Sequence, residues 1–279
     1  MLDAPTIQGA YINLLRPSGK HPKGFSPKTI KNVHRVLHKA LQQAVLIGYI
    51  RFNPADTCIL PRVEKAKVAP CDDAQISPFI KEARGNRFET LFVVTLFTGV
   101  REGEILGLTW DCVDFDNGVL TINKQMQLHQ DKDMKAYQLV STKNSKARTI
   151  ITAAPFVMER LKHRKVEQTK ERLLAGPLWQ QSGLVFTDAT GNHITKPTLY
   201  RAFKKAAASI GRPDARFHDL RHSYAVAALR SGDDIKTVQG NLGHATAAFT
   251  LDVYGHVTDQ MKQDSASRME QFIKTVSGS

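Results

Sequence analysis

Cysteine is scarce in this sequence, and a long hydrophobic run is absent. The three cysteines, Cys58, Cys71 and Cys112, are odd in number and lack the spacing of zinc ligands, so they indicate reduced thiols of a cytosolic protein. The longest apolar run, around residues 91–97, is far too short to span a bilayer. Residues 1–11 lack the basic start and apolar core of a signal peptide. These absences argue against a disulfide-rich or membrane protein, and we expect a soluble protein of the cytoplasm.

Negative charge is also in short supply. The 26 Asp and Glu residues are outnumbered by 39 Lys and Arg, which gives a net charge of +13. A charge of this sign and size favours a polyanionic partner, because neutralising phosphates releases counterions. The alternative is a basic surface without a special partner. Apolar residues make up 42% of the 279 positions, a composition typical of a globular protein with one large domain or two modest ones.

The first 62 residues predict a small helical unit. A short amphipathic segment, TIQGAYINLL, is followed by a basic linker, and Ser26-Pro27 then begins a longer helix that we expect to run through Ile50. Residues 53–72 hold three prolines and no periodicity, and we place the linker between two domains at 63–72. Four basic residues lie mostly off the apolar face of the long helix, which suits either phosphate contacts or simple solvation. They are Lys28, Lys31, Arg35 and Lys39.

Residues 73–279 predict a larger, mainly helical domain with a short β-sheet, so the fold class we expect is α+β. One expected helix is almost wholly apolar, which indicates that it is buried, and Gly99 stops it. Two β-rich arms flank the polar turn KNSKA, with Lys143 at the tip of the hairpin they would form. The expected helices cover 73–83, 87–98, a stretch that begins near 101, 155–174 and most of 196–275; the other expected strands cover 119–123 and 184–187.

Several residues in this larger domain could carry chemistry, although each also has an ordinary structural interpretation. Arg101 follows a Gly-Val turn at a helix start, where it could simply pair with Glu104 one turn later. His218 and Arg221 are three residues apart and share one helical face, where a lone histidine is commonly a capping or core residue. Tyr254 could be a half-buried aromatic at a helix end. Taken together, a nucleophile, fixed cations and imidazoles are what an enzyme needs to attack a phosphodiester without a metal.

The order and spacing of these residues resemble the tyrosine recombinases, the integrase family of phages and integrative conjugative elements. The matching stretches are TGVREGEILGLTW (98–110), STKNSKARTI (141–150), HDLRHSYA (218–225) and NLGHATAAFTLDVYGHV (241–257). They fall on the family's arginine box, hairpin lysine, HxxR box and LGH…Y box. The segment SPKTIKNVHRVLHKALQQAV matches more weakly.

The resemblance implies a mechanism for the cleavage and rejoining of DNA strands. Tyr254 would attack the scissile phosphate and form a 3′-phosphotyrosyl link, which conserves the energy of the phosphodiester. Arg101 and Arg221 would stabilise charge on the non-bridging oxygens, because a guanidinium offers several donors in a rigid fork. Lys143 would protonate the leaving oxygen as a general acid. His218 would take or relay the tyrosine proton, His244 would bind the phosphate, Glu104 would orient the arginines, and neither a metal nor another cofactor is expected.

The resemblance also implies how the chain is organised and what it binds. Residues 1–62 would be part of a core-binding (SAM-like) domain, and 73–279 a catalytic domain whose last helix, 258–275, docks on a neighbouring protomer in a tetramer on DNA; folding back onto its own domain is the alternative. Family members carry an arm-binding domain and further helices before this point, so we expect a fragment or a truncated gene. Residues expected to contact DNA are Lys28, Lys31, Arg35, Lys39, Lys146 and Arg148.

The implied partners are double-stranded attachment sites on nucleoid DNA, with a directionality factor and a host DNA-bending protein as further candidates. The implied process is integration and excision of a mobile element, and a conjugative transposon is the interpretation that we favour.

Three other interpretations are open at the level of the sequence. A metal-dependent phosphodiesterase could use His218 and His222, but the HDLRH segment lacks a general-base glutamate. A non-catalytic DNA-binding regulator could use the helix-turn-helix-like segment 233–254, but it would not need Arg101, Lys143 and Tyr254. A type IB topoisomerase shares the chemistry, but the LGH box and the short chain favour a recombinase.

Overall fold

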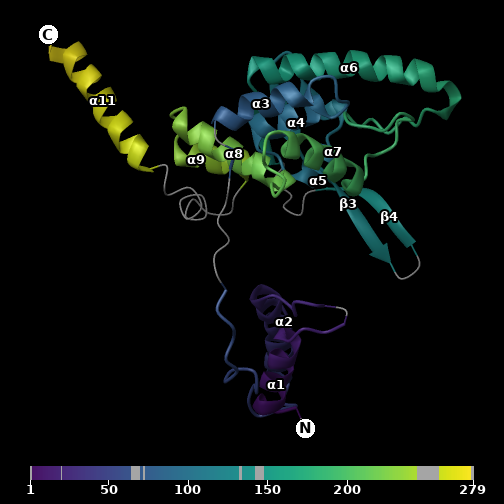
Figure 1. Ribbon diagram of the computed structural model, residues 1–279, viewed down its shortest axis with the longest axis vertical. Helices are drawn as coiled ribbons and strands as arrows, with labels where there is room; N and C mark the ends of the chain where they lie inside the picture. The colour runs from purple at the N-terminus through teal and green to yellow at the C-terminus, as the bar shows by residue number, and fades with distance from the viewer. Residues whose placement is uncertain are drawn as a thin grey trace. The chain divides into compact units, whose positions relative to one another are not determined.

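The computed structural model describes residues 2–19, 21–63, 70–71, 73–131, 134–141, 148–243 and 258–277 (Figure 1). The chain divides into two compact units, Met1–Lys67 and Val68–Ser279, and each is considered by itself. In these ranges no helix is both long enough and apolar enough to cross a membrane.

The N-terminal unit is built on two helices that are capped by short polar side chains. Asp3 accepts a hydrogen bond from the Thr6 amide at the start of α1 (Ala4–Leu15), and Ser26 accepts one from the Thr29 amide at the start of α2 (Pro27–Leu46). The predicted start of α2 is confirmed, but the helix ends at Leu46 instead of Ile50. The reason is Gly48, whose φ of 81° is a left-handed conformation that ends helices. The buried core of this unit comprises Ile7, Tyr11, Ile30 and Ala55.

Helix α4 (Glu89–Thr98) is the centre of the larger unit, between α3 (Asp73–Ala83) and α5 (Glu102–Leu106) in the sequence. Most of its side chains are buried, and its C-cap Gly99 has a φ of 65°, so the predicted buried helix and its stop are confirmed. A side chain at Gly99 would also collide with Tyr224 and Leu242. Aromatic rings with centroids 5.6 to 6.3 Å apart pack around this helix: Phe79, Phe88, Phe92, Phe203 and Phe217.

The β-strands form two separate antiparallel sheets. One has the order β1 (Val113–Asp114), β2 (Val119–Ile122), β5 (Arg148–Thr152), and the strand predicted at 119–123 is confirmed. The other is a hairpin in which β3 (Lys124–Asp131) pairs with β4 (Met134–Ser141).

The pairing of these strands corrects the hairpin predicted around KNSKA. The two arms do not pair with each other, because β4 belongs to the hairpin and β5 to the three-stranded sheet. The cause is strand β3, which the sequence analysis did not recognise. It is adjacent to β4 in the chain, so eight residue pairs form with almost no loop to close.

The long helix α6 (Pro155–Ala175) is confirmed, but the strand predicted at 184–187 is wrong. That segment makes only isolated bridges, from Leu184 to Thr109 and from Thr187 to His193. The carbonyl groups of this segment instead accept hydrogen bonds from side chains of α6: Arg164 Nε donates to Val185 O, and Gln168 Nε2 donates to Leu184 O. A carbonyl that is satisfied by a side chain does not need a strand partner. The short 3₁₀ segments of this unit are η1 (Trp110–Cys112) and η2 (Gly176–Leu178).

The helical pattern predicted over most of 196–275 is confirmed, within the described residues, as four helices, with Gly211, Gly232 and Gly243 in left-handed conformations after the first three. They are α7 (Lys196–Ser209), α8 (Phe217–Arg230), α9 (Ile235–Leu242) and α11 (Thr258–Ser277). Helix α8 packs on α4 and on α9, so that α4 lies between α6 and α8 (Figure 1). This packing places the N-terminal turn of α8 near the C-terminal ends of α4 and α9.

Candidate active site

A buried arginine ties together the ends of two helices. Arg221, on α8, is 2% exposed. Its Nη1 donates to Gly99 O at 2.5 Å, and its Nη2 donates to Leu242 O. These carbonyls belong to the ends of α4 and α9, where each helix stops at a left-handed glycine, Gly99 or Gly243. Carbonyls at a helix C-terminus carry partial negative charge, which offsets the cost of burying the guanidinium.

A second arginine, from α5, binds the same end of α9. Arg101 is the N-cap residue of α5, and its Nη2 donates to Gly243 O at 3.1 Å. Its Nη1 donates to Glu104 Oε1 at 2.8 Å, and its backbone N–H donates to Glu104 Oε2 at 2.8 Å. The Glu104 side chain is 3% exposed, whereas that of Arg101 is 42% exposed. The buried carboxylate therefore holds the guanidinium in place while one side of it stays open to solvent.

The structure thus brings Arg101, Glu104 and Arg221 to one place. The two arginines are 120 positions apart in the sequence, and they bind consecutive carbonyl groups, Leu242 O and Gly243 O. A guanidinium has five N–H donors, and the contacts of Arg101 with described residues use two of its side-chain donors. Arg101 can therefore bind a further anion. The residue that follows Gly243 in the chain is His244.

Four of the predicted site residues lie outside the described residues: Lys143, Lys146, His244 and Tyr254. Arg148 begins β5, and its side chain is outside the description as well. The basic residues predicted to contact DNA from α2 are all exposed, with spacings of three or four residues that place them along one side of the helix. They are Lys28, Lys31, Arg35 and Lys39.

His218 lies in the first turn of α8, one turn before Arg221. Protein packed around the imidazole removes part of its hydration, which lowers its pKa below the usual value, and the charges of Arg221, Arg216 and Arg101 lower it further. Asp219 acts in the opposite sense, but with a smaller effect than the first two arginines. The lowered pKa favours the neutral form of His218 at neutral pH, and a neutral imidazole can accept a proton.

His222 packs edge-on against His218, with ring centroids 4.8 Å apart and an angle of 89° between the planes. It is 8% exposed. Burial, followed by the nearby His218, lowers the pKa of His222 to about 4. Within the described ranges, no three His, Cys, Asp or Glu side chains lie close enough together to hold a metal ion.

The sequence analysis missed a second arginine–carboxylate pair, at the start of α8. Asp219 Oδ2 accepts the backbone N–H of Arg216 at 2.8 Å, and Asp219 Oδ1 accepts from Arg216 Nη2 at 2.9 Å. This geometry repeats that of Arg101 and Glu104 on α5. The available signal was an arginine three residues before a carboxylate at a helix start, which occurs at both places.

Two glycines, one within α5 and one at its C-cap, were also missed as parts of the site. A side chain at Gly103 would approach Met126 O to 3.1 Å, and one at Gly107 would meet the backbone of Gln125 and Met126 at 2.8 Å. These glycines therefore let the backbone of β3 lie directly against α5. The hairpin that precedes Lys143 is in this way packed on the helix that carries Glu104.

Removal of the Glu104 charge tests whether this carboxylate positions Arg101. We expect Glu104→Gln to slow DNA cleavage by about 10- to 100-fold, because an amide oxygen replaces a charged acceptor of two hydrogen bonds. DNA binding should change little. The matched control is Glu102→Gln, which alters a more exposed acid of the same helix turn that pairs with Lys196 at 3.8 Å. Equal cleavage rates for the Glu104 variant and the wild type would contradict this role.

The lowered pKa of His222 predicts acid sensitivity. Between pH 4 and about 6.5 the unfolded chain binds a proton at this residue and the folded chain does not, so stability is full above pH 6.5 and falls towards pH 4. We expect a loss on the order of 3 kcal/mol across this window. Urea unfolding, followed by tryptophan fluorescence at several pH values, gives the free energy of unfolding as a function of pH. Between pH 4 and about 6.5 this free energy should change less steeply with pH in His222→Gln than in the wild type. His163→Gln, at an exposed site on α6, is the control, and an unchanged slope in the His222 variant would refute the assignment.

Comparisons with known proteins identify the family of this chain. Residues 72–261 match the phage integrase family. The chain is 31% identical to a tyrosine recombinase XerC-like protein of Caldanaerobacter subterraneus, over 94% of this chain and 69% of that protein. It is 25% identical to the ICEBs1 integrase of Bacillus subtilis, over 90% of this chain and 67% of that one. It thus spans about two thirds of the length of these relatives.

The fold is similar to that of a solved integrase. The structure of the Tn1549 transposon integrase in complex with a circular intermediate DNA superposes with a TM-score of 0.76, at 22% sequence identity, and covers 96% of this chain and 85% of that one. The family match includes every predicted catalytic position from Arg101 to Tyr254. These findings favour a recombinase over a non-catalytic regulator. The chain belongs to the phage integrase family of tyrosine recombinases, site-specific DNA recombinases that cleave and rejoin strands through a tyrosine intermediate.

Proposed function

We propose that this chain cleaves one DNA strand at a time through Tyr254 and rejoins it to a different strand. The tyrosine oxygen attacks the scissile phosphorus, the bond from phosphorus to the 5′-oxygen breaks, and a 3′-phosphotyrosyl ester forms while a 5′-hydroxyl leaves. Lys143 donates the proton that the leaving oxygen needs. Attack by the 5′-hydroxyl of another strand reverses these steps without an external energy source.

The observation that carries this proposal is the meeting of two guanidinium groups at the C-terminal end of α9. Arg221 and Arg101 bind consecutive carbonyls, directly before the segment that contains His244 and Tyr254. A phosphate at this point would meet two planar cations, and in phosphoryl transfer such cations stabilise charge on the non-bridging oxygens. The two carbonyls that precede this segment in the chain are thus bound by the same arginines that would bind the phosphate.

The neutral state of His218 supports a role as proton acceptor. A tyrosine hydroxyl must lose its proton as it attacks, and a histidine with a lowered pKa is free to take or relay that proton at neutral pH. Glu104 has a different proposed part. It is bound to Arg101 through both carboxylate oxygens, so its proposed part is to position that arginine.

The DNA substrate and the assembly are further parts of the proposal. The exposed basic side of α2 would contact the backbone of a double-stranded attachment site, together with Lys146 and Arg148. Helix α11 exposes an apolar set that would dock on a neighbouring protomer in a tetramer; its described members are Met269, Phe272 and Ile273. A directionality factor and a host DNA-bending protein would assist the integration and excision of a mobile element on nucleoid DNA in the cytoplasm.

A trapping experiment tests the proposed function. Nicked duplexes with a randomised core are incubated with the protein in EDTA, so that cleavage releases a short fragment and leaves the covalent intermediate unable to reverse. A protein–DNA adduct that resists denaturation, with Tyr254 as the modified residue, is the expected result. Sequencing of the trapped DNA would give the preferred site at the same time. DNA binding without any adduct would refute the proposed chemistry.

A further inference from the structure

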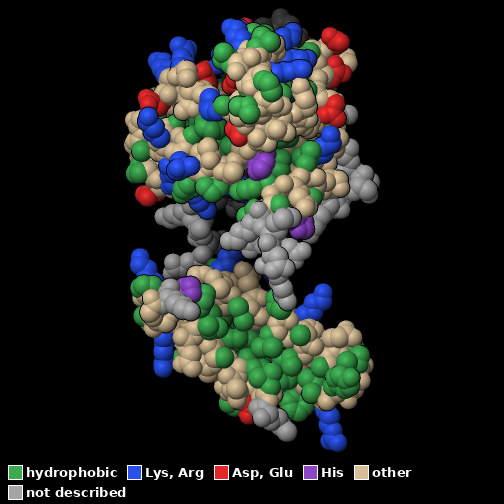
Figure 2. Space-filling model, turned by 90° about the vertical axis from the view of Figure 1, so that its right-hand side faces the viewer, with side chains coloured by type: hydrophobic (Ala, Val, Ile, Leu, Met, Phe, Trp, Pro, Cys, Tyr) green, Lys and Arg blue, Asp and Glu red, His purple; other side chains and the backbone are tan. Residues whose placement is uncertain are grey.

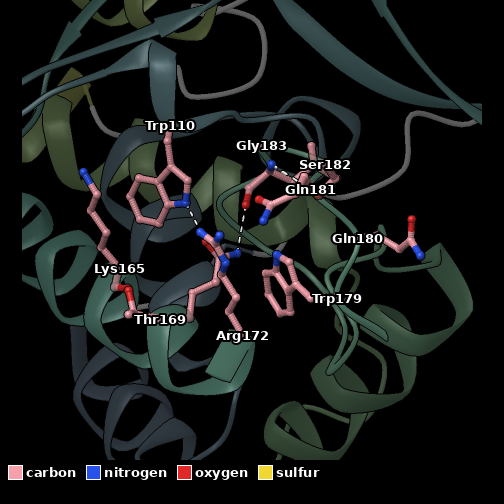
Figure 3. A pocket seen from close by; sticks show the side chains of 11 residues that line it. Trp110, Lys165, Thr169, Arg172, Trp179, Gln180, Gln181, Ser182 and Gly183 are labelled. Carbon is pink, nitrogen blue, oxygen red and sulfur yellow. Dashed lines mark hydrogen bonds between the residues drawn. The ribbon is translucent and has the colours of Figure 1, made fainter. Parts of the chain in front are cut away.

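A second concave site lies on the other side of α4 from the catalytic arginines. It is a pocket of about 190 Å³ between the C-terminal half of α6 and the segment 179–184 (Figure 3). Helix α4 separates α6 from α8, the helix that carries His218 and Arg221 (Figure 1). The function proposed above leaves this pocket without a role.

The tryptophans of this protein are concentrated in the pocket. The chain contains two tryptophans, Trp110 and Trp179, and both line it. Figure 3 shows their indole rings on two sides of the pocket with Arg172 between them. Tryptophan and arginine are the residue types that most often dominate the binding energy of protein interfaces, because they combine a large contact area with directed hydrogen bonds.

The charge of the pocket has one sign. Its lining contains the cations Lys165 and Arg172 and no carboxylate. In the described part of the chain neither cation takes part in an ion pair. The glutamates of α6 nearest in sequence, Glu167 and Glu171, instead pair with Arg164. The site is therefore complementary to a negatively charged group.

The wall of the pocket is held rigidly. Trp110 Nε1 donates to Gln168 Oε1 at 2.6 Å, and Gln168 Nε2 donates to Leu184 O at 2.9 Å. Lys165 Nζ lies 5.6 Å from the centroid of the Trp110 ring and 5.3 Å from that of Phe115, so an aromatic surface supports the ammonium group. Binding would consequently require little ordering of the wall, which favours affinity.

We infer that this pocket binds an acidic peptide segment of a partner protein, with carboxylates of the segment on Lys165 and Arg172. Gln181 lies beside Arg172: in one orientation of its amide, the side-chain oxygen accepts from Arg172 Nη2 at 3.0 Å and from Arg172 Nε at 3.2 Å, which fixes the guanidinium in the pocket. A nucleic acid fits less well. The centroids of the Trp110 and Phe115 rings are 6.2 Å apart, and the Lys165 ammonium lies over the Trp110 ring. The faces of Trp110 on which a base would stack are therefore already in contact with protein groups.

Tryptophan fluorescence gives a direct test, because both fluorophores of the intact chain lie in the pocket. The probes are acetyl-Glu-Asp-Leu-Asp-Glu-amide, its uncharged counterpart acetyl-Gln-Asn-Leu-Asn-Gln-amide, and a short oligothymidylate. The acidic peptide should shift the emission in a saturable manner and more weakly at high salt, since screening reduces the attraction. Arg172→Gln and Lys165→Gln should each weaken its binding about tenfold. Lys170→Gln, an exposed lysine of α6 outside the pocket, should bind like the wild type.

Each of the other outcomes would overturn the inference. A response to the uncharged peptide as strong as that to the acidic one would remove the role of charge. Tighter binding of the oligothymidylate would make the pocket a nucleic-acid site. Absence of any response at millimolar acidic peptide, or equal binding by Arg172→Gln and the wild type, would leave the pocket without this ligand. Because DNA cleavage is not part of the readout, these results are independent of the proposed recombination chemistry.

Discussion

Tyr254→Phe should abolish the covalent adduct in the nicked-duplex experiment and leave DNA binding within about twofold of the wild type. The substitution removes a single oxygen, which the proposed mechanism assigns to the attack on phosphorus, and keeps the aromatic ring. Loss of a nucleophile commonly lowers a rate by about 10⁴-fold or more, because the remaining groups have no covalent path to act on. Formation of the covalent adduct is measured as its yield on a denaturing gel. DNA binding is measured in a separate titration.

The matched control is Tyr200→Phe, which removes the same oxygen from a tyrosine of α7 that is 49% exposed. It should form the adduct at the wild-type rate. An adduct that persists in Tyr254→Phe would mean that another side chain is the nucleophile, and peptide mapping of the adduct would identify it. Loss of binding together with cleavage would instead assign Tyr254 a structural part in the DNA-binding surface.

The fold was predictable from the sequence wherever a local signal was strong. The almost wholly apolar sequence of α4 and its stop at Gly99 indicated a buried helix, and the Ser26-Pro27 pair indicated the start of α2. The strand β3 was not predictable in the same way. Its sequence, KQMQLHQD, is mostly polar, and its stability comes from pairing with β4 and from packing against α5.

Hydrogen bonds from side chains of α6 explain why the segment 184–187 was wrongly predicted as a strand. Its composition is that of a strand, but Arg164 and Gln168 of α6 bind its carbonyls. Such a competition between a side chain and a neighbouring strand depends on tertiary packing, and a period-two pattern contains no information about it.

For the site, the sequence predicted which residue types matter but not how they are held. Arg101, Glu104, His218 and Arg221 were selected by motif, and the structure places them around the end of α9. The partners that hold the arginines are backbone carbonyls, Gly99 O, Leu242 O and Gly243 O. Every residue has a carbonyl, so its use as a partner leaves no trace in the sequence except the glycines that end the helices.

These carbonyl contacts lead to the second large prediction, a contrast between the two arginines. Arg221→Lys should lower the cleavage rate by about 10²- to 10³-fold, since an ammonium cannot present two parallel donors to a phosphate. It should also lower the free energy of unfolding by on the order of 2 kcal/mol, because a lysine leaves at least one buried carbonyl without its partner. Arg101→Lys should lose cleavage to a similar extent but keep nearly all of its stability, because its side chain is 42% exposed and an ammonium can still pair with Glu104.

The contrast separates binding of the phosphate from support of the helix ends. Cleavage is measured on the nicked duplex, and stability by urea unfolding with the tryptophans of the larger unit as the probe. If both variants lose cleavage and only Arg221→Lys loses stability, both arginines bind the phosphate, and only Arg221 also stabilises the fold. If Arg221→Lys unfolds more easily but cleaves normally, the buried guanidinium is a structural tie between α4 and α9, and Arg101 alone would have to stabilise the charge on the phosphate.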